Sequence, residues 1–309
     1  MGERIRLGLV GVGKIARDQH LPAIAADKRF ELVATASRSP QQVEGVPGYG
    51  SIEEMIAGGH ELDAVTLCTP PAGRHAIAAA AIEAGLHVMM EKPPATTLSE
   101  VEDLALRAQA KGVVLYTSWH SRAAAGVEPA RAWLQGKRVT GLRIAWKEDI
   151  RRWHPGQEWI LGPGGFGVFD PGINALSIVT AILPDALFVE EAKLRTPENR
   201  DAPIAASLKM RTGGAPGTFE LDFLQTGPQS WDIEVDTDAG TLKLHEGGSK
   251  LELPGEPVRP GENREYPNLY AHFAGLLASG RSDVDVRPLR LVADAMLLAA
   301  HERVEAFSF

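Results

Sequence analysis

The stretch RLGLVGVGKIA, residues 6–16, decides the fold of the first part of this chain. Its first half is apolar and typical of a strand, and its second half passes through two glycines into a helical pattern. Gly11, Gly13 and Ala16 fit the GxGxxA variant of the dinucleotide fingerprint, which provides a tight turn, close approach of the backbone to a pyrophosphate, and close helix–strand packing. The phosphates of a bound dinucleotide would then meet the positive end of the helix. The residues predicted to form this site are Gly11, Gly13, Lys14, Ile15 and Ala16.

Strands and helices alternate along the next hundred residues, which is the context that this fingerprint requires. Strands are expected at 30–38, 63–69, 86–90 and 113–119, and helices at 51–59, 74–85 and 99–112. Thr97–Glu100 precede the last of these helices as a capping sequence. Such alternation predicts βαβ units and a parallel sheet covered by helices on both faces.

The second part of the chain has a different pattern. From residue 139 onward, long runs alternate between apolar and polar residues, with tight turns between several of them, and predict a mostly antiparallel sheet. Helices are expected at 173–183, 266–280 and 288–305, the last of them packing back toward the first domain. The predicted fold class is α/β: a Rossmann doubly wound parallel sheet at 1–120, and an α+β domain at 121–309 for substrate binding and dimerisation.

The composition excludes several classes of function. The chain has 309 residues, of which 44% are hydrophobic and 23% charged, as in an ordinary globular protein. The net charge is −8, and there is no basic block, so nucleic acid and anionic membranes are not expected partners. Nine histidines are scattered without a recognised metal-ligand spacing, so no metal site is expected.

The single cysteine, Cys68, excludes an intrachain disulfide and fits a reducing compartment. The N-terminal residues lack the apolar core of a signal peptide, and no stretch approaches the roughly 18 apolar residues of a membrane span. We therefore expect a cytoplasmic protein.

The end of the second expected strand indicates which nucleotide is bound. An acidic residue about 20 residues after the glycines would bind the ribose 2′-hydroxyl of NAD. This chain has Ser37 and Arg38 there instead, a hydroxyl and a guanidinium that suit a 2′-phosphate. NADP is therefore the preferred cofactor, with NAD tolerated. The alternative is that Arg38 is an ordinary solvated loop arginine.

Four strings together resemble the Gfo/Idh/MocA oxidoreductases: GVGKIA at 11–16, CTPP at 68–71, EKPP at 91–94 and GGFGVFDPGIN at 164–174. The resemblance covers essentially the whole chain. WKEDIRRWHPGQ at 146–157 is closest to the aldose 1-dehydrogenases of that family. The resemblance implies NAD(P)+-dependent oxidation of L-arabinose, D-galactose or D-fucose at C1 to the aldonolactone.

Lys92 ends a strand and precedes two prolines, a pattern that is also found in surface turns. In the family that the chain resembles, this lysine faces the nicotinamide and the substrate hydroxyl. Open α/β sheets place their ligands at the carboxyl ends of the strands, which agrees with that role. Glu91 is expected to orient its surroundings or balance charge. The resemblance further implies cofactor contacts from Thr69, Pro70, Pro71, His75, Glu91 and Lys92.

Asp170 is the expected base for the C1 hydroxyl, and Asn174, four residues on, shares its helix face and would orient the sugar. Asp-Pro-Gly at a helix start also fits an N-cap with proline at the first helical position, so capping is an alternative role for Asp170. Many family members carry a histidine at position 174. Asparagine cannot titrate, so proton transfer must then depend on Asp170 or Lys92.

Sugar recognition requires aromatic faces and polar partners for hydroxyl groups, although single tryptophans and histidines more often have structural roles. The predicted substrate-binding residues are Lys92, Trp119, His120, Glu148, Trp153, His154, Asp170, Asn174 and, less strongly, Trp231. The family also implies a homodimer through the exposed face of the C-terminal sheet, on the reasoning that an uncovered apolar face binds a partner. Two other functions stay open: another family oxidoreductase acting on a different sugar or polyol, and a non-catalytic NADP-binding sensor.

Overall fold

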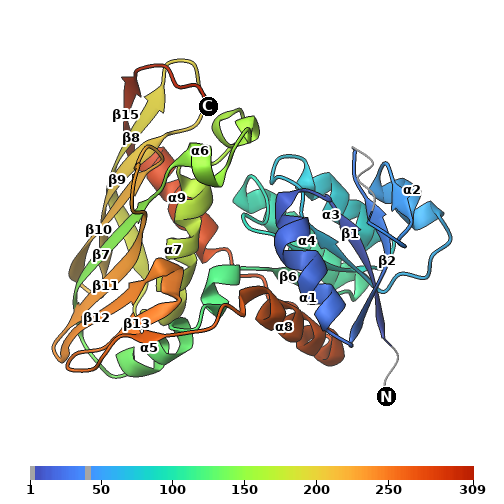
Figure 1. Cartoon of the computed structure of the whole chain (residues 1–309), viewed down its shortest axis with the longest axis horizontal. Helices are drawn as coiled ribbons and strands as arrows, with labels where there is room; N and C mark the ends of the chain where they lie inside the picture. Colours follow the sequence, from blue (N-terminus) through green and yellow to red (C-terminus); the bar gives the residue numbers. More distant parts are fainter. Residues whose placement is uncertain (1–3, 39–42) are drawn as a thin grey trace. The chain divides into compact units, whose positions relative to one another are not determined.

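The computed structural model describes residues 4–38 and 43–309. The chain divides into two compact units (Figure 1). The first comprises residues 1–119 together with 266–286, and the second comprises 120–265 together with 287–309.

The first unit is built on a six-stranded parallel sheet in the order β3-β2-β1-β4-β5-β6. Its strands are β1 (Ile5–Val10), β2 (Phe30–Ala36), β3 (Gly48–Tyr49), β4 (Ala64–Leu67), β5 (His87–Met90) and β6 (Leu115–Thr117). This is the predicted doubly wound order. It makes β1 and β4 neighbours, so the segments that follow them lie side by side at the carboxyl edge, where open α/β sheets bind ligands.

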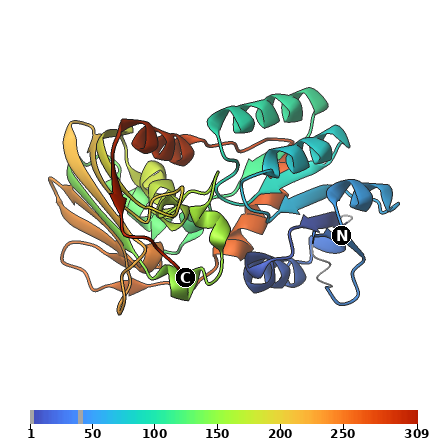
Figure 2. The ribbon, with the colours of Figure 1, turned by 90° about the horizontal axis from the view of Figure 1, so that it is seen from above.

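Helices cover both faces of this sheet. They are the π-helix η1 (Ala16–His20), α1 (Leu21–Ala26), α2 (Ile52–Ala57), α3 (Arg74–Glu83), α4 (Leu98–Lys111) and α8 (Glu265–Ser279). The helices α1 and α8 share one apolar core with the sheet, and α2, α3 and α4 share another. Figure 2 shows the teal α3 and α4 on one side of the sheet and the blue α1 on the other.

The start of α4 has the capping box expected from the sequence. The Glu100 N–H donates to Thr97 Oγ1 at 3.3 Å, and the Thr97 N–H donates to Glu100 Oε2 at 3.2 Å. Gly112 ends the helix in the left-handed conformation at φ 68°. These two signals fix both ends of the element that precedes β6.

The helix α8 belongs to the first unit although it comes late in the sequence, and this differs from the predicted second domain of 121–309. Tyr270 and Phe273 are fully buried, and their rings lie 5.3 and 6.3 Å from the ring of Phe30 at the start of β2. The helix fills the same apolar core as α1. A sequence pattern does not reveal which sheet an apolar helix will cover, because that depends on tertiary packing.

The second unit contains a nine-stranded sheet in the order β14-β13-β12-β11-β7-β10-β9-β8-β15. Its strands are β7 (Val139–Lys147), β8 (Leu187–Pro197), β9 (Ala205–Thr212), β10 (Ala215–Asp222), β11 (Ser230–Thr237), β12 (Gly240–His245), β13 (Lys250–Glu252), β14 (Arg259–Pro260) and β15 (Ala299–Val304). The β7–β10 and β8–β15 pairs are parallel and the others antiparallel, so the sheet is mostly antiparallel, as predicted.

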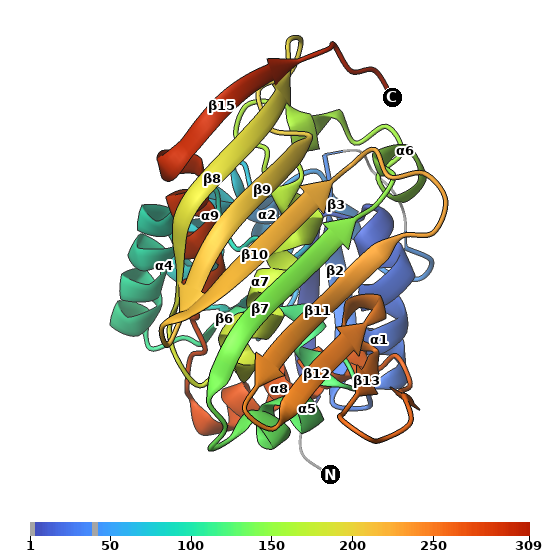
Figure 3. The same ribbon diagram turned by 90° about the vertical axis from the view of Figure 1, so that its left-hand side faces the viewer.

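One face of this sheet is covered by helices (Figure 3). The helical segments of the unit are η2 (His120–Ala123), α5 (Val127–Leu134), α6 (Ile150–Trp153), η3 (Glu158–Leu161), α7 (Phe169–Ile182), η4 (Glu246–Gly248) and α9 (Arg287–Leu298). The helices α5, α7 and α9 contact β12, β7 and β8 respectively. Along β7, Leu142, Ile144 and Trp146 are buried, as the alternating pattern predicts.

The opposite face of the sheet carries charged side chains. Arg143 on β7 pairs with Glu234 at 2.8 Å and with Asp236 at 2.6 Å, both on β11. His245 on β12 lies 2.9 Å from Asp232 and 3.1 Å from Glu252. The expectation of an uncovered apolar face is therefore wrong, and it no longer supports a dimer.

The C-terminal residues correct another expectation. The predicted helix at 288–305 ends at Leu298, and Ala299–Val304 continue as the edge strand β15, paired in parallel with β8. The helix α9 contacts α7 and β8 of its own unit. Ala-Ala-His-Glu-Arg-Val contains no residue that stops a helix, so the pairing with β8 overrides a weak local preference. No helix among residues 4–38 and 43–309 is long and apolar enough to cross a membrane.

Candidate functional site

The loop after β1 has the geometry that a dinucleotide requires. Gly11 has φ +93°, and a Cβ there would lie 2.8 Å from the Thr69 nitrogen, so only glycine fits between these two loops. The space above Gly13 is open. Ala16 is fully buried against the sheet. Of the other predicted residues of this loop, Ile15 is exposed, and Lys14 is exposed and pairs with Asp18.

The loop after β4 offers a polar group whose bonding capacity is unused. The Thr69 hydroxyl oxygen is buried and has no hydrogen-bond partner among the described residues. An orphaned buried hydroxyl is costly unless a bound molecule supplies its partner. Together with the tight turn at Gly11 and the open backbone at Gly13, it fits a dinucleotide held by Gly11–Ala16 and Thr69–Pro71.

Ser37 and Arg38 follow β2, the neighbour of β1. The Ser37 N–H donates to the Tyr49 carbonyl at 2.9 Å, which fixes the main chain there, and Arg38 is exposed. A guanidinium at this strand end lies at the carboxyl edge of the sheet, as the sequence suggested.

Lys92 lies just beyond β5, also at the carboxyl edge of the sheet. Its N–H donates to Oε2 of the preceding Glu91 at 2.9 Å, and the Lys92–Pro93 peptide bond is cis. Glu91 is 3% exposed. The predicted strand end is therefore present, and the glutamate is turned inward rather than toward solvent.

Glu91 belongs to a buried hydrogen-bond network. Its Oε1 lies 3.0 Å from His20 Nε2 and accepts a hydrogen bond of 2.8 Å from the Tyr266 hydroxyl, while His20 Nδ1 lies 2.8 Å from the Tyr270 hydroxyl. Burial alone would lower the pKa of His20, but the neighbouring Cys68 thiol, Tyr270 hydroxyl and Glu91 carboxylate outweigh it, and the pKa lies well above its usual value. A carboxylate held in this way supports an orienting role for Glu91.

Arg74 contacts both the loop after β4 and the loop after β5. It is the first residue of α3 and is buried, and its guanidinium donates to the carbonyl oxygens of Thr69, Glu91 and Pro93. The next residue, His75, turns toward α4, where its Nε2 lies 2.7 Å from Asp103. A cofactor contact by His75 stays a prediction.

Asp170 and Asn174 lie in the first two turns of α7. The helix begins at Phe169 with Val168 as its N-cap, so Asp170 is the second helical residue and the N-cap interpretation is wrong. The Asp170 carboxylate is nevertheless buried in the first turn of the helix. Asn174 is partly exposed and lies one turn further along the same face.

Four of the predicted sugar-binding residues lie together: Glu148, Trp153, His154 and Trp231. The buried Glu148 carboxylate lies 2.9 Å from His154 Nε2 and accepts a hydrogen bond of 2.8 Å from Trp231 Nε1. The Trp231 and Trp153 rings are edge to face, with centroids 4.9 Å apart. The cluster combines a carboxylate, an imidazole and two indoles, and the sugar-binding role predicted for these residues stays a prediction.

A cavity of about 300 Å³ lies beside this cluster. It is lined by Arg152, Trp153, Gly227, Pro228, Gln229, Trp231, Asp232 and Glu246. Gln229 fixes one wall, since its Oε1 accepts hydrogen bonds from the Asp149 N–H at 2.7 Å and from Trp153 Nε1 at 3.2 Å. The indole of Trp153 is therefore held in place, although the residue as a whole remains 37% exposed.

Trp119 and His120 are engaged elsewhere. Trp119 is buried, and its Nε1 donates to the Asp285 carbonyl at 3.0 Å. His120 Nδ1 lies 2.5 Å from a Glu265 carboxylate oxygen. Because these contacts occupy the indole N–H and one imidazole nitrogen, roles of both residues in sugar binding stay predictions.

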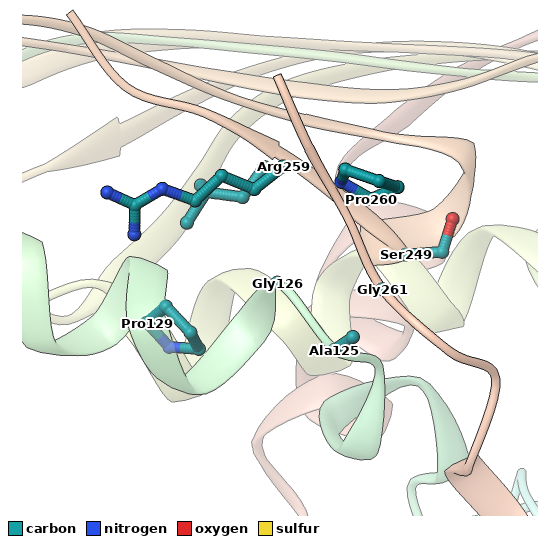
Figure 4. A pocket seen from close by; sticks show the side chains of 8 residues that line it. Ala125, Gly126, Pro129, Ser249, Arg259, Pro260 and Gly261 are labelled. Carbon is teal, nitrogen blue, oxygen red and sulfur yellow. The ribbon is translucent and has the colours of Figure 1, made fainter. Parts of the chain in front are cut away.

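A second hollow, of about 110 Å³, lies between the start of α5 and the strands β13 and β14 (Figure 4). None of the predicted site residues lines it, and its one charged side chain, Arg259, pairs with Glu256. No group of three or more histidine, cysteine or acidic side chains in the described parts of the chain is placed to hold a metal ion.

Comparison with known proteins decides the family. Residues 5–118 match the family model described as "Oxidoreductase family, NAD-binding Rossmann fold". The chain is 46% identical over 304 residues to a galactose 1-dehydrogenase of Pseudomonas fluorescens, and the match covers 98% of both chains. This protein belongs to the Gfo/Idh/MocA oxidoreductase family.

Solved structures agree with this assignment. The D-galactose-1-dehydrogenase protein from Rhizobium etli is 52% identical, with a TM-score of 0.93 and coverage of 100% of this chain and 99% of that one. A 3-ketoreductase from Actinomadura kijaniata, solved with NADP and TDP-benzene, has a TM-score of 0.82 at 19% identity and shares the fold. The Gfo/Idh/MocA resemblance and the NAD-binding Rossmann sheet expected from the sequence are confirmed.

The structure of this Gfo/Idh/MocA protein also identifies contributors that the sequence did not point to. His20, Arg74 and Gln229 each support a predicted residue through a hydrogen bond from another part of the chain. The one sequence signal was the position of Arg74, directly after the CTPP loop and at the head of an alanine-rich helix. His20 and Gln229 are distant in sequence from the groups they support.

Proposed function

We propose that the protein is an NAD(P)+-dependent aldose 1-dehydrogenase that oxidises D-galactose, L-arabinose or D-fucose at C1 to the aldonolactone. The observation that carries this proposal is the full-length similarity to two galactose 1-dehydrogenases, at 46% and 52% identity. Gly11, Gly13 and the unpartnered Thr69 hydroxyl support the binding of a dinucleotide to the same chain.

We infer that NADP is preferred over NAD. Arg38 offers a charge-assisted hydrogen bond to a 2′-phosphate and Ser37 a neutral one, and no carboxylate stands at either position to repel it. Because the exposed guanidinium is not needed for the ribose hydroxyl of NAD, NAD remains a usable cofactor.

The proposed chemistry divides between a lysine and a carboxylate. Gly11–Ala16 and Thr69–Pro71 would hold the dinucleotide, which would supply the acceptor for the hydride from C1 of the sugar. Lys92 donates a hydrogen bond to the C1 oxygen and stabilises the negative charge that develops there. Asp170 takes the proton of the C1 hydroxyl. Asn174 cannot titrate and orients the sugar by hydrogen bonding.

We place recognition of the sugar at the Glu148 cluster. A pyranose presents an apolar C–H face and several hydroxyls, and the cluster supplies indole rings for the first and Glu148 with His154 for the second. L-Arabinopyranose and D-galactopyranose share ring stereochemistry and differ in the hydroxymethyl group at C5. Both are therefore expected substrates, with a preference that depends on space and polar groups near C5.

Two further expectations stay predictions. A cytoplasmic location rests on the lone cysteine, which fits a reducing compartment. A homodimer through the C-terminal sheet would have to use the charged face that carries Arg143, Glu234 and Asp236.

The test is absorbance at 340 nm with purified protein, NAD or NADP, and a panel of aldoses and polyols. The proposal predicts rapid reduction with D-galactose, L-arabinose or D-fucose, faster with NADP, and loss of turnover by orders of magnitude in Lys92→Ala. Turnover with a polyol such as inositol but none of these aldoses would instead indicate another oxidoreductase of the family. Binding of NADP without turnover of any compound would indicate a sensor.

A further inference from the structure

Arg74 presents an unusual combination of charge, burial and hydrogen bonding. Only 2% of its surface is exposed. One terminal nitrogen of its guanidinium donates to the carbonyls of Glu91 and Pro93, and the other donates to the carbonyl of Thr69. A guanidinium presents five donors in a rigid plane, so this one side chain can bond to two separate loops at once.

The carbonyls that Arg74 holds are those on either side of Lys92. Its bonds to Glu91 and Pro93 fix the carbonyl groups of the residues before and after the lysine, while the Lys92 N–H is fixed by Glu91 Oε2 at 2.9 Å. The main chain of Lys92 therefore cannot shift without breaking at least one buried hydrogen bond. Breaking such a bond is costly because a buried polar group is left without a partner.

The third carbonyl belongs to the loop after β4. Thr69 carries the buried hydroxyl that has no partner among the described residues, and its backbone nitrogen lies against Gly11. Arg74 thus links the loop that we assign to the cofactor with the segment that carries the lysine. A side chain needed only to fill this space would cost less as an apolar residue, because a buried cation must be desolvated.

We propose that Arg74 is a positioning residue for the reaction, which fixes Lys92 relative to the cofactor loop. It acts through Lys92 and does not touch the substrate. The proposal rests on the proposed role of Lys92 in the chemistry. A displacement of about 1 Å in a reacting group can cost on the order of 100-fold in rate, so a rigid support is worth a buried charge.

Arg74→Lys keeps the charge but replaces the planar fork by a single nitrogen on a shorter group, which cannot span both loops. We expect a fall in kcat of roughly 10- to 100-fold, with little change in the Kd for NADPH and a retained circular-dichroism spectrum. Arg29→Lys is the matched control, since Arg29 is an exposed arginine of the same unit, paired with Asp27. It should leave kcat unchanged.

A double-mutant cycle separates positioning from a general structural effect. If Arg74 acts through Lys92, then Arg74→Lys lowers kcat in the wild type but leaves the residual turnover of Lys92→Ala nearly unchanged. Equal fold-losses in the two backgrounds would overturn the proposal, as would wild-type kcat in Arg74→Lys. If Lys92→Ala itself turned over normally, the proposed chemistry would fail, and the inference with it.

A second variant covers a failure to fold. If Arg74→Lys loses its cooperative unfolding transition, the same cycle is run with Arg74→Gln, whose neutral amide retains donors without an ill-placed buried charge. If neither variant folds with saturating NADP present, Arg74 is required for the fold rather than for positioning, and the proposal is overturned.

Discussion

The role assigned to Asp170 depends on the residue at which the helix begins. In the sequence, Asp-Pro-Gly suggested a capping aspartate followed by proline at the first helical position. In the structure the N-cap is Val168, and Pro171 is the third residue of α7. The carboxylate therefore lies within the first turn, buried, and the proposed role of Asp170 as a base no longer competes with a role as the N-cap residue.

Asp170→Asn should distinguish the proposed role of Asp170 as a base from a purely structural role. Removing the proposed base is expected to lower kcat by about 10²- to 10⁴-fold. The free energy of unfolding should fall by less than about 1 kcal/mol, which is the usual size of a helix-dipole contribution. The measurements are steady-state kinetics and urea unfolding. A large loss of stability with unchanged kcat would contradict the assignment and restore a structural role.

Arg38 carries the prediction of nucleotide preference. Arg38→Ala should remove about 1.5–3 kcal/mol of charge-assisted hydrogen bonding to a 2′-phosphate, which corresponds to roughly a 10- to 100-fold rise in the KM for NADP. The KM for NAD should change little, because the ribose hydroxyl does not need a cation. Equal changes in the two KM values would show that Arg38 is an ordinary surface residue.

At the scale of elements, the helical segment after the glycine fingerprint is not a regular α-helix. Five of its residues, Ala16–His20, form a π-helix before α1 begins at Leu21. Such wider turns are common at functional sites. Here the last residue of the turn is His20, which reaches Glu91 and Tyr270 in the interior. The helix of the dinucleotide loop is thereby bonded to the residue that precedes Lys92.

The raised pKa of His20 gives a pH dependence whose sign can be worked out. Because the folded-state pKa is higher than the unfolded value of about 6.5, His20 contributes stability that is fully present below that value and is lost as the pH rises through the folded-state pKa. The free energy of unfolding should therefore fall between pH 6 and pH 9 more in the wild type than in His20→Gln. The exposed His301→Gln is the control.

Urea unfolding at a series of pH values measures this difference. Burial also raises the pKa of Tyr270. Tyr270 would therefore add its own pH dependence to the free energy of unfolding at the pH where tyrosines titrate, so the series should stay below that range. Parallel pH profiles for wild type and His20→Gln would show that the histidine is buried in its neutral form.

At the scale of the whole molecule, the chain returns to its first unit after completing most of the second. The returning helix α8 buries Leu269, Tyr270 and Phe273 in the core that covers one face of the parallel sheet. Each such side chain contributes about 1.5–3 kcal/mol when buried, and a typical domain is stable by only 5–15 kcal/mol. The first unit without α8 should therefore be unstable.

This predicts the behaviour of two fragments. Residues 1–119 alone should lack a cooperative thermal transition, whereas the same residues joined to 266–286 by a flexible linker should unfold cooperatively and bind NADP. Calorimetry measures both properties. The linked fragment with Phe273→Ser serves as the control and should be destabilised. An equally stable 1–119 fragment would show that α8 is dispensable.

Much of the fold could be predicted from the sequence because local patterns determine it. The glycine fingerprint, the alternation of strands and helices and the capping box at Thr97 are all short-range signals, and they predicted the parallel sheet. The packing of α8 in the first unit depends on β2, and the formation of the strand β15 by residues 299–304 depends on β8. Both partners are far away in sequence. No local pattern could show these.

The site divides in the same way. Lys92 and Glu148 could be selected as candidate site residues from the sequence, because each is a charged residue within a motif that is typical of the family. Their supports could not be selected in this way. His20 looks like an ordinary helix residue, and the only signal for Arg74 is its position shortly after the CTPP loop, until the fold brings both to Glu91. For Trp119, the sequence suggested sugar binding but could not show that the indole N–H bonds to the Asp285 carbonyl, so that role stays a prediction.

The most direct test of the central claim is the fate of the hydrogen on C1 of the sugar. The purified protein would be incubated with NADP and D-galactose deuterated at C1, and the reduced nucleotide analysed by mass spectrometry and NMR. If the sugar is oxidised at C1, one deuterium should appear at C4 of the nicotinamide, with galactonolactone as the other product. Unlabelled NADPH, or deuterium retained in the sugar product, would contradict oxidation at C1.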